Sequence, residues 1–187
     1  MREIRVKNYA DVCIGEYPFH KQLKDEFVPL LEKYPDKQGR RTNVIATMTE
    51  WDWNPENVRL KRLKNNILEF VNYNCNYYPV RSIEDIKSVR YFINDFWGNI
   101  YRKGDYTREH HHRPHIFSFV YFLKSKWYHS PLVFSDSGKK IRPKERTFVI
   151  FPSHLKHLVP KHRYRETRIT LSGNILINRY PFVEKES

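Results

Sequence analysis

Residues 116–123, with the sequence IFSFVYFL, are almost continuously apolar and predict a strand that is buried on both faces. From Ser88 onward the chain contains further short segments that are rich in β-branched and aromatic residues, and turn signals separate them. One of these strand candidates follows Ser88, where polar and apolar residues alternate. The others are residues 131–135, 147–151 and 169–177. The second half of the chain is therefore expected to be mainly β.

The first half of the chain has a different pattern, in which apolar residues recur at helical spacing in two segments. These residues are Phe19, Leu23, Phe27, Leu30 and Leu31 in the first segment and Leu60, Leu63, Ile67, Leu68 and Val71 in the second. Residues 4–7 and 42–49 (TNVIATMT) predict short strands. Helices followed by many short strands favour a β-sandwich or jelly roll that is supported by helices on one side.

The length of 187 residues suits one domain with a substantial core. We expect a single domain over residues 1–187, with a helix-rich support region at 1–87 and a jelly-roll core at 88–180. The two cysteines match no metal-binding spacing and require no oxidising compartment. The N-terminus does not resemble a secretory signal, and no apolar run approaches the about 20 residues of a membrane span. We therefore expect a cytoplasmic protein without membrane contact, in the host cytoplasm if a phage encodes it.

The net charge of +13 favours acidic partners, such as a nucleic acid or an acidic protein or peptide. The basic residues are dispersed, with denser groups at residues 59–64, 139–146 and 161–168. No helix-turn-helix, zinc-finger or RNA-binding sheet signature accompanies them. The charge alone is equally compatible with a basic protein that binds no nucleic acid.

Eight of the nine histidines lie between positions 110 and 162, and the densest group is residues 109–115 (EHHHRPH). On a strand, alternate side chains share a face, so His110 and His112 would point the same way. A third imidazole from a distant strand would complete one face of a metal's coordination sphere and leave the other positions open. If the other face of the strand pointed inward, Glu109 and His111 would be the pair that points toward the metal. A histidine run can also be a solvated loop or a fortuitous zinc site.

Several motifs follow one another in an order typical of one enzyme group. They are Tyr101-Arg102-Lys103-Gly104, His110-His111-His112, SFVYFL at 118–123, FPSHLKHLVP at 151–160 and Arg168-Ile169-Thr170. In order and spacing this set, scattered over about residues 42–174, resembles the iron(II)/2-oxoglutarate-dependent oxygenases. Within that superfamily the chain is most similar to the prolyl-hydroxylase-like branch, and particularly to small oxygenases of bacteria and phages.

The resemblance implies a double-stranded β-helix in which His110, His112 and His157 bind Fe(II). It implies that Arg168, 11 residues after His157, binds the distal carboxylate of the cosubstrate 2-oxoglutarate. A guanidinium pairs bidentately with a carboxylate and stays charged when it is buried. Thr170 would face the same way as Arg168 on a strand and share that carboxylate, and Tyr101 would also contact the cosubstrate. O2 is the second substrate, ascorbate could stimulate turnover, and no catalytic residue beyond the metal ligands is expected.

Two positions depart from the pattern of that branch. His112 stands where the usual metal triad has a carboxylate, which makes the ligand set neutral; Asp136 could in principle supply an acid. Three-histidine iron sites are chemically feasible, since imidazole suits iron, zinc, copper and nickel. Phe122 stands where relatives often have a second tyrosine, so one cosubstrate hydrogen bond would be missing.

The resulting expectation is an iron(II)- and 2-oxoglutarate-dependent dioxygenase that hydroxylates a C–H bond. By analogy with the prolyl-hydroxylase-like branch, the substrate would be a peptide or protein, with proline the first candidate. The alternatives are a non-catalytic basic jelly roll that binds nucleic acid or an acidic protein, and a zinc or manganese enzyme that does not use 2-oxoglutarate. Arg168 and Thr170 argue against the last, since a carboxylate clamp would have no purpose there. The sequence predicts neither the oxidised atom nor the oligomeric state.

Overall fold

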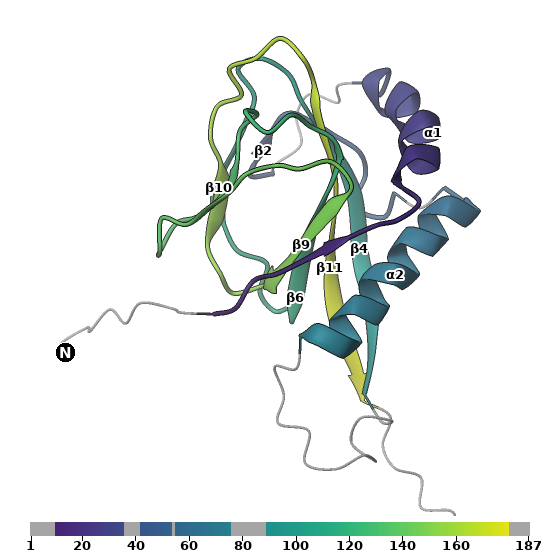
Figure 1. Ribbon diagram of the computed structural model, residues 1–187. Helices are drawn as coiled ribbons and strands as arrows, with labels where there is room; N and C mark the ends of the chain where they lie inside the picture. Colours follow the sequence, from purple (N-terminus) through teal and green to yellow (C-terminus); the bar gives the residue numbers. More distant parts are fainter. Residues whose placement is uncertain (1–9, 36–41, 54, 76–88, 180–187) are drawn as a thin grey trace, which may run out of the picture.

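A computed structural model describes residues 10–35, 42–53, 55–75 and 89–179. Two antiparallel sheets face each other in it (Figure 1). In order across the sheet, the six-stranded one contains β1 (Cys13–Glu16), β9 (Thr147–Pro152), β6 (Phe117–Lys124), β11 (Arg168–Arg179), β4 (Val89–Tyr101) and β3 (Thr47–Met48). The five-stranded sheet contains β2 (Val44–Ile45), β5 (Tyr106–His110), β10 (His157–Val159), β7 (Leu132–Phe134) and β8 (Lys140–Ile141). The expected mainly β architecture is confirmed.

Most strand candidates appear close to their expected positions, as β4, β6, β7, β9 and β11. The candidate at residues 42–49 is divided: β2 pairs with β5 in one sheet and β3 pairs with β4 in the other. The sequence analysis did not predict β1, β8 or β10, which are only two to four residues long. The strand expected at residues 4–7 lies outside the described residues.

Both predicted helices, α1 (His20–Glu32) and α2 (Val58–Asn74), cover the outer face of the six-stranded sheet (Figure 1). The N-terminus of α2 is capped by Asn57, whose side chain accepts hydrogen bonds from the backbone N–H groups of Arg59 and Leu60. The buried residues of the helices are Leu23, Phe27 and Leu31 in α1 and Leu60, Leu63, Ile67 and Val71 in α2. The apolar periodicity therefore predicted most of each packing face, whereas Phe19 and Leu30 of the first segment are exposed. No helix in the described part of the chain is long and apolar enough to span a membrane.

The pairing of β11 with β4 places polar side chains between the two sheets. Ile169 and Leu171 of β11 belong to the core that packs against the helices. Since side chains alternate along a strand, Arg168, Thr170 and Ser172 point to the opposite, inner face. Their partners across the ladder on β4 are Tyr101, Asn99 and Trp97 respectively. These six residues form one polar wall of the space between the sheets.

Gly173 is the position on β11 where a side chain fits least. A Cβ atom there would lie 2.6 Å from the backbone oxygen of Asp95 and 2.7 Å from the Phe119 ring. We expect Gly173→Ala to lower the free energy of unfolding by about 1–3 kcal/mol, because neighbouring strands must move apart. Gly98→Ala is the matched control: its Cβ would meet side-chain carbons and no backbone atom, at 3.0 Å from Leu31, 3.3 Å from Thr49 and 3.7 Å from Leu171. Urea unfolding of both variants measures the difference, and an equal loss would contradict the expectation.

Candidate functional site

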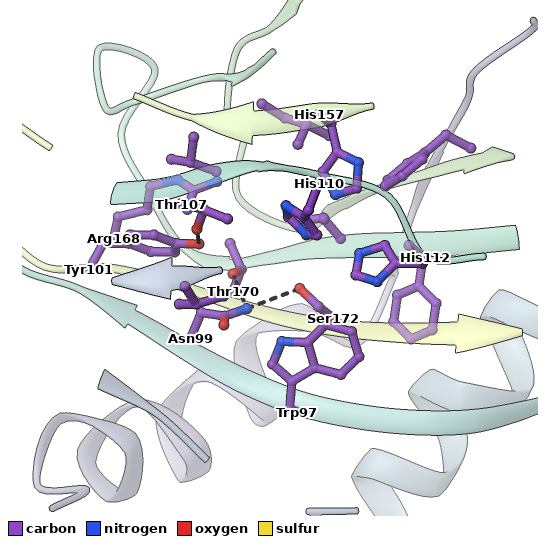
Figure 2. A pocket seen from close by; sticks show the side chains of 16 residues that line it. Trp97, Asn99, Tyr101, Thr107, His110, His112, His157, Arg168, Thr170 and Ser172 are labelled. Atoms are coloured by element: carbon purple, nitrogen blue, oxygen red, sulfur yellow. Dashed lines mark hydrogen bonds between the residues drawn. The ribbon is translucent and has the colours of Figure 1, made fainter. Parts of the chain in front are cut away.

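Three histidine rings converge at one end of the space between the sheets (Figure 2). His110 is the last residue of β5, and His157, the first residue of β10, is its direct partner across the ladder. His112 lies beyond the end of β5, where its backbone N–H donates a 2.8 Å hydrogen bond to the carbonyl of Ser153. The potential ligand nitrogens of the three residues all lie within 4.8 Å of one another.

The expected common direction of His110 and His112 is confirmed, but the strand is shorter than expected. His110 and His112 were expected to share one face of a continuous strand, but the strand ends at His110. The ring of His112, two residues further on, nevertheless lies with the other two, and its backbone is bonded to Ser153. The alternative pair is not assembled: Glu109 and His111 are both exposed, and Glu109 lies 4.0 Å from Lys156. Asp136 is also exposed and lines a different hollow.

Backbone carbonyls fix the tautomers of two of the three rings. The Nδ1 atom of His110 lies 2.8 Å from the carbonyl oxygen of Arg108, and that of His157 lies 3.0 Å from the carbonyl oxygen of Leu155. A carbonyl oxygen can only accept, so each Nδ1 carries the proton and donates it. The Nε2 atoms of both rings therefore have free lone pairs, which is the usual arrangement of metal-binding histidines.

Burial keeps these imidazoles neutral. Loss of solvent, reinforced by the neighbouring rings, lowers the pKa of His112 to about 2 and that of His157 to about 3. Burial also lowers the pKa of His110. A metal ion at neutral pH would not have to displace a proton from any of the three rings.

The low pKa values make the stability of the metal-free protein depend on pH. His157 takes up a proton near pH 6.5 when unfolded but only near pH 3 when folded, so acid favours the unfolded state. Between pH 7 and pH 5 we expect His157 alone to lower the free energy of unfolding by about 2 kcal/mol. Urea unfolding at the two pH values tests this. His157→Gln, which cannot be protonated, should lose less stability over the same interval, and an equal loss would contradict the expectation.

Arg168 lies at the opposite end of the same space from the histidines (Figure 2). Its side chain is 1% exposed, and its Nε and Nη1 atoms have no hydrogen-bond partner among the described residues. Its Cζ atom lies 4.7 Å from the centre of the Tyr101 ring and 5.5 Å from that of Phe122. Burial lowers the pKa of Arg168, and Tyr101 partly opposes that effect. A buried cation with unused donors in a fixed fork suits a carboxylate ligand.

Polar side chains lie between the histidines and Arg168 (Figure 2). The amide nitrogen of Asn99 donates to the hydroxyl oxygen of Ser172 at 3.1 Å and to that of Thr170 at 3.4 Å. Asn99 Oδ1 and Trp97 Nε1 are buried and have no partner in the described part of the chain. Buried polar atoms are normally satisfied, so this group of unused atoms also suggests room for a polar ligand.

Tyr101 is fully enclosed beside Arg168, and its hydroxyl shares a 2.7 Å hydrogen bond with the hydroxyl of Thr107. Burial raises the pKa of Tyr101, so the phenol stays protonated and can donate. The structure thus brings all six residues expected from the sequence to one cavity. Asn99, Ser172, Thr107 and the inward position of Trp97 were missed. The alternation of Trp97, Asn99 and Tyr101 was a usable signal, since the three share one face of a strand.

These residues line a cavity of about 40 Å³. An adjoining recess of about 180 Å³ shares Val44, Trp97, His110 and His112 with the cavity and extends to Trp51 and His111. Trp51 is 44% exposed and packs edge-on against Trp97, with ring centres 4.6 Å apart. The histidines therefore lie at the junction of an inner cavity, which ends at Arg168, and an outer recess.

Solved structures with the same fold were found across most of the chain. A collagen prolyl hydroxylase of Paramecium bursaria Chlorella virus-1, in complex with 2-oxoglutarate, has a TM-score of 0.62 and 15% identity, over 87% of this chain and 94% of its own. A Pseudomonas putida prolyl-4-hydroxylase has a TM-score of 0.63 and 16% identity, over 90% and 92%. A Trichoplax adhaerens prolyl hydroxylase, in complex with a hypoxia inducible factor peptide fragment, has a TM-score of 0.62 and 14% identity, over 88% and 83%.

These likenesses confirm the expected double-stranded β-helix and the structural resemblance to prolyl hydroxylases and other 2-oxoglutarate/iron(II) oxygenases. No protein-family model matches the chain, and no curated protein sequence matches it. At 14–16% identity the solved structures establish the fold. The chemistry has to be argued from the residues of this chain.

Proposed function

We propose that this protein is an iron(II)- and 2-oxoglutarate-dependent dioxygenase that hydroxylates a C–H bond. One observation carries the proposal: three neutral imidazoles and a buried guanidinium with unused donors occupy the two ends of a single cavity. A fold shared with 2-oxoglutarate/iron(II) oxygenases adds support. A non-catalytic binding module would have no use for a buried cation with two unused donors, which costs stability.

The residues fit both missing groups. The Nε2 atoms of His110 and His157 and the ring of His112 would hold the metal, and Arg168 would bind the distal carboxylate of 2-oxoglutarate. Thr170 and Tyr101 would donate to the same carboxylate from the adjacent wall. With iron(II) and O2, 2-oxoglutarate is oxidised to succinate and CO2, and this reaction supplies the oxidant for C–H hydroxylation.

The chain itself contributes orientation and exclusion of water. Apolar side chains from both sheets close the cavity, namely Phe119, Val120, Leu132, Phe151 and Val159. In such an environment the contacts of Arg168 with an anion are stronger than in water. The carbonyls of Arg108 and Leu155 hold the rings of His110 and His157 in place, so the ligand set is preorganised.

The outer recess is the natural approach for a substrate, because it reaches the histidines without passing Arg168. We propose a peptidyl substrate, with a prolyl residue as the first candidate. The prolyl hydroxylases that share the fold, one of them in complex with a peptide, support this choice. The exposed ring of Trp51 at the rim would offer an apolar surface to such a side chain.

Succinate release is the direct test of the proposal. Purified protein supplied with iron(II), 2-oxoglutarate, O2 and ascorbate should form succinate slowly even without substrate. Zinc in place of iron should give none, because zinc has no redox chemistry. Absence of succinate from a sample that demonstrably binds both iron(II) and 2-oxoglutarate would contradict the proposed function.

A further inference from the structure

The cavity contains positive charge and no negative charge of its own. Of the described residues that line it, Arg168 is the one permanently charged side chain, and none is an aspartate or a glutamate. The three histidines are neutral donors. A divalent metal would therefore add two positive charges to a cavity that already holds a buried guanidinium.

Resting on the proposed function, we propose that the metal and 2-oxoglutarate bind with strong mutual cooperativity. A metal bound alone is repelled by Arg168, and none of the described residues that line the cavity offers a carboxylate to offset that repulsion. The dianion of 2-oxoglutarate has one carboxylate for each end of the cavity, so it neutralises the metal and the guanidinium at the same time. In this protein the cosubstrate supplies the negative charge that a carboxylate at position 112 would have supplied.

The size of the effect follows from the environment. Charges in a buried cavity are screened less than charges at the surface. Couplings between two ligand sites commonly correspond to about 5–150-fold changes in affinity. In this protein we expect 2-oxoglutarate to raise the affinity for the metal at least about 10-fold. By thermodynamic reciprocity the metal must tighten 2-oxoglutarate binding by the same factor.

The wild-type protein alone can reveal the coupling. Anaerobic calorimetric titration of iron(II) is performed without ligand, with saturating 2-oxoglutarate and with saturating pyruvate. Pyruvate is also a 2-keto acid, but it has one negative charge and no distal carboxylate for Arg168. We expect 2-oxoglutarate to tighten iron(II) binding at least about 10-fold and pyruvate to have a much smaller effect.

Two substitutions test the cause. Arg168→Met removes the repelling cation, so iron(II) alone should bind more tightly than to the wild type, while the effect of 2-oxoglutarate should largely vanish. His112→Asp supplies a negative charge, so it should also tighten the binding of iron(II) alone and reduce the coupling. Thermal unfolding of each variant establishes that it is folded.

The outcomes separate this inference from the proposed function. Tight iron(II) binding that is the same with and without 2-oxoglutarate would overturn the cooperativity and leave the metal site intact. Iron(II) binding under none of the conditions would overturn both. Coupling of equal size with pyruvate would show that Arg168 takes no part in it, which also contradicts the inference.

A second, independent feature is a cluster of aromatic and basic side chains on the surface, away from the cavity. The β6–β7 and β10–β11 connections form it, and the latter arches over the upper end of the barrel in Figure 1. We call this cluster the aromatic–basic surface. Its members are Lys126, Trp127, Tyr128, Lys161, Arg163, Tyr164 and Arg165. Trp127 is 73% exposed and Tyr164 is 38% exposed. None of these residues lines the cavity or the outer recess.

The rings of this surface form a connected group on a fixed support. The ring centre of Tyr128 lies 4.7 Å from that of Tyr164 and 5.8 Å from that of Trp127. Beneath them, the buried rings of His129 and His162 lie 4.8 Å apart. The backbone of His162 exchanges two 2.7 Å hydrogen bonds with the β4–β5 turn. The exposed rings are therefore held by a rigid part of the barrel.

The geometry points to single-stranded nucleic acid as the ligand of this surface. The four basic side chains are all exposed, and the nearest acid along the chain is Glu166, which accepts a hydrogen bond from Tyr128. Exposed rings among cations are suited to stacking with bases while the cations contact phosphates. An acidic peptide would use the charges but not the rings.

The test is fluorescence anisotropy of a labelled oligo-dT of about 15 nucleotides. Trp127→Ala should weaken binding about 5–150-fold, which corresponds to the loss of one stacked base. Arg163→Glu with Arg165→Glu should weaken it strongly, whereas Lys139→Glu with Lys140→Glu, an equal charge change in another basic segment, should have little effect. The assignment would be overturned if the two double substitutions had equal effects or if Trp127→Ala had none. It would also be overturned if polyglutamate bound as tightly as the oligonucleotide.

Discussion

Replacing Arg168 by methionine should weaken the binding of 2-oxoglutarate by about 30-fold or more while making the ligand-free protein more stable. The loss of affinity follows because removal of one partner of a buried charge pair costs about 2–5 kcal/mol, and each 1.4 kcal/mol is tenfold. The gain in stability follows because Arg168 is 1% exposed and two of its nitrogens have no partner among the described residues. An apolar side chain of similar volume avoids that cost.

Calorimetry with 2-oxoglutarate in the presence of metal measures the first effect, and urea unfolding of the ligand-free protein measures the second. Arg165→Met is the matched control, since Arg165 is exposed on the loop that precedes β11. It should change neither the affinity nor the stability appreciably. A destabilised Arg168→Met variant with unchanged affinity would show that Arg168 is a structural residue and would remove the main support for the proposed cosubstrate site.

Much of the fold could be predicted because its longest elements carry clear periodicities. The apolar residues of α1 and α2 recur at helical spacing, and β6 is a nearly continuous apolar run because helices cover one of its faces and the second sheet covers the other. β1, β8 and β10 were missed because two to four residues are too few to show alternation. The division of residues 42–49 between two sheets depends on strand partners far away in sequence, which a local pattern does not specify.

The site was predicted unevenly for a related reason. His110, His112, His157 and Arg168 have chemically distinctive side chains, so their types and order could be recognised before any geometry was known. Asn99 is a common residue type, and its role depends on its position opposite Thr170 in the β4–β11 ladder. The placement of His112 depends on its backbone bond to Ser153, a tertiary contact. Residue chemistry was thus visible in the sequence, whereas the contacts that orient it were not.

Replacing His157 by alanine should weaken iron(II) binding by more than about 100-fold. Loss of a residue that only supports a metal ligand weakens metal binding by up to about 100-fold, and His157 is itself a proposed ligand. His157 is 4% exposed and its ring lies within 5.1 Å of both other rings, centre to centre, so its removal takes away one of the three converging donors. His110→Ala should have an effect of the same size, since the two residues are direct partners in the β5–β10 ladder. Anaerobic calorimetry with iron(II) measures both losses.

The control substitutions make this result specific to the proposed triad. His111→Ala and His154→Ala each remove an imidazole from the same part of the chain, but neither residue belongs to the group whose ligand nitrogens converge. Both variants should keep iron(II) affinity close to that of the wild type. If His111→Ala were as damaging as His110→Ala, the opposite strand phase with Glu109 would be the correct one. If none of the four substitutions mattered, the metal would bind elsewhere, and the buried guanidinium of Arg168 would need a different anionic ligand to explain it.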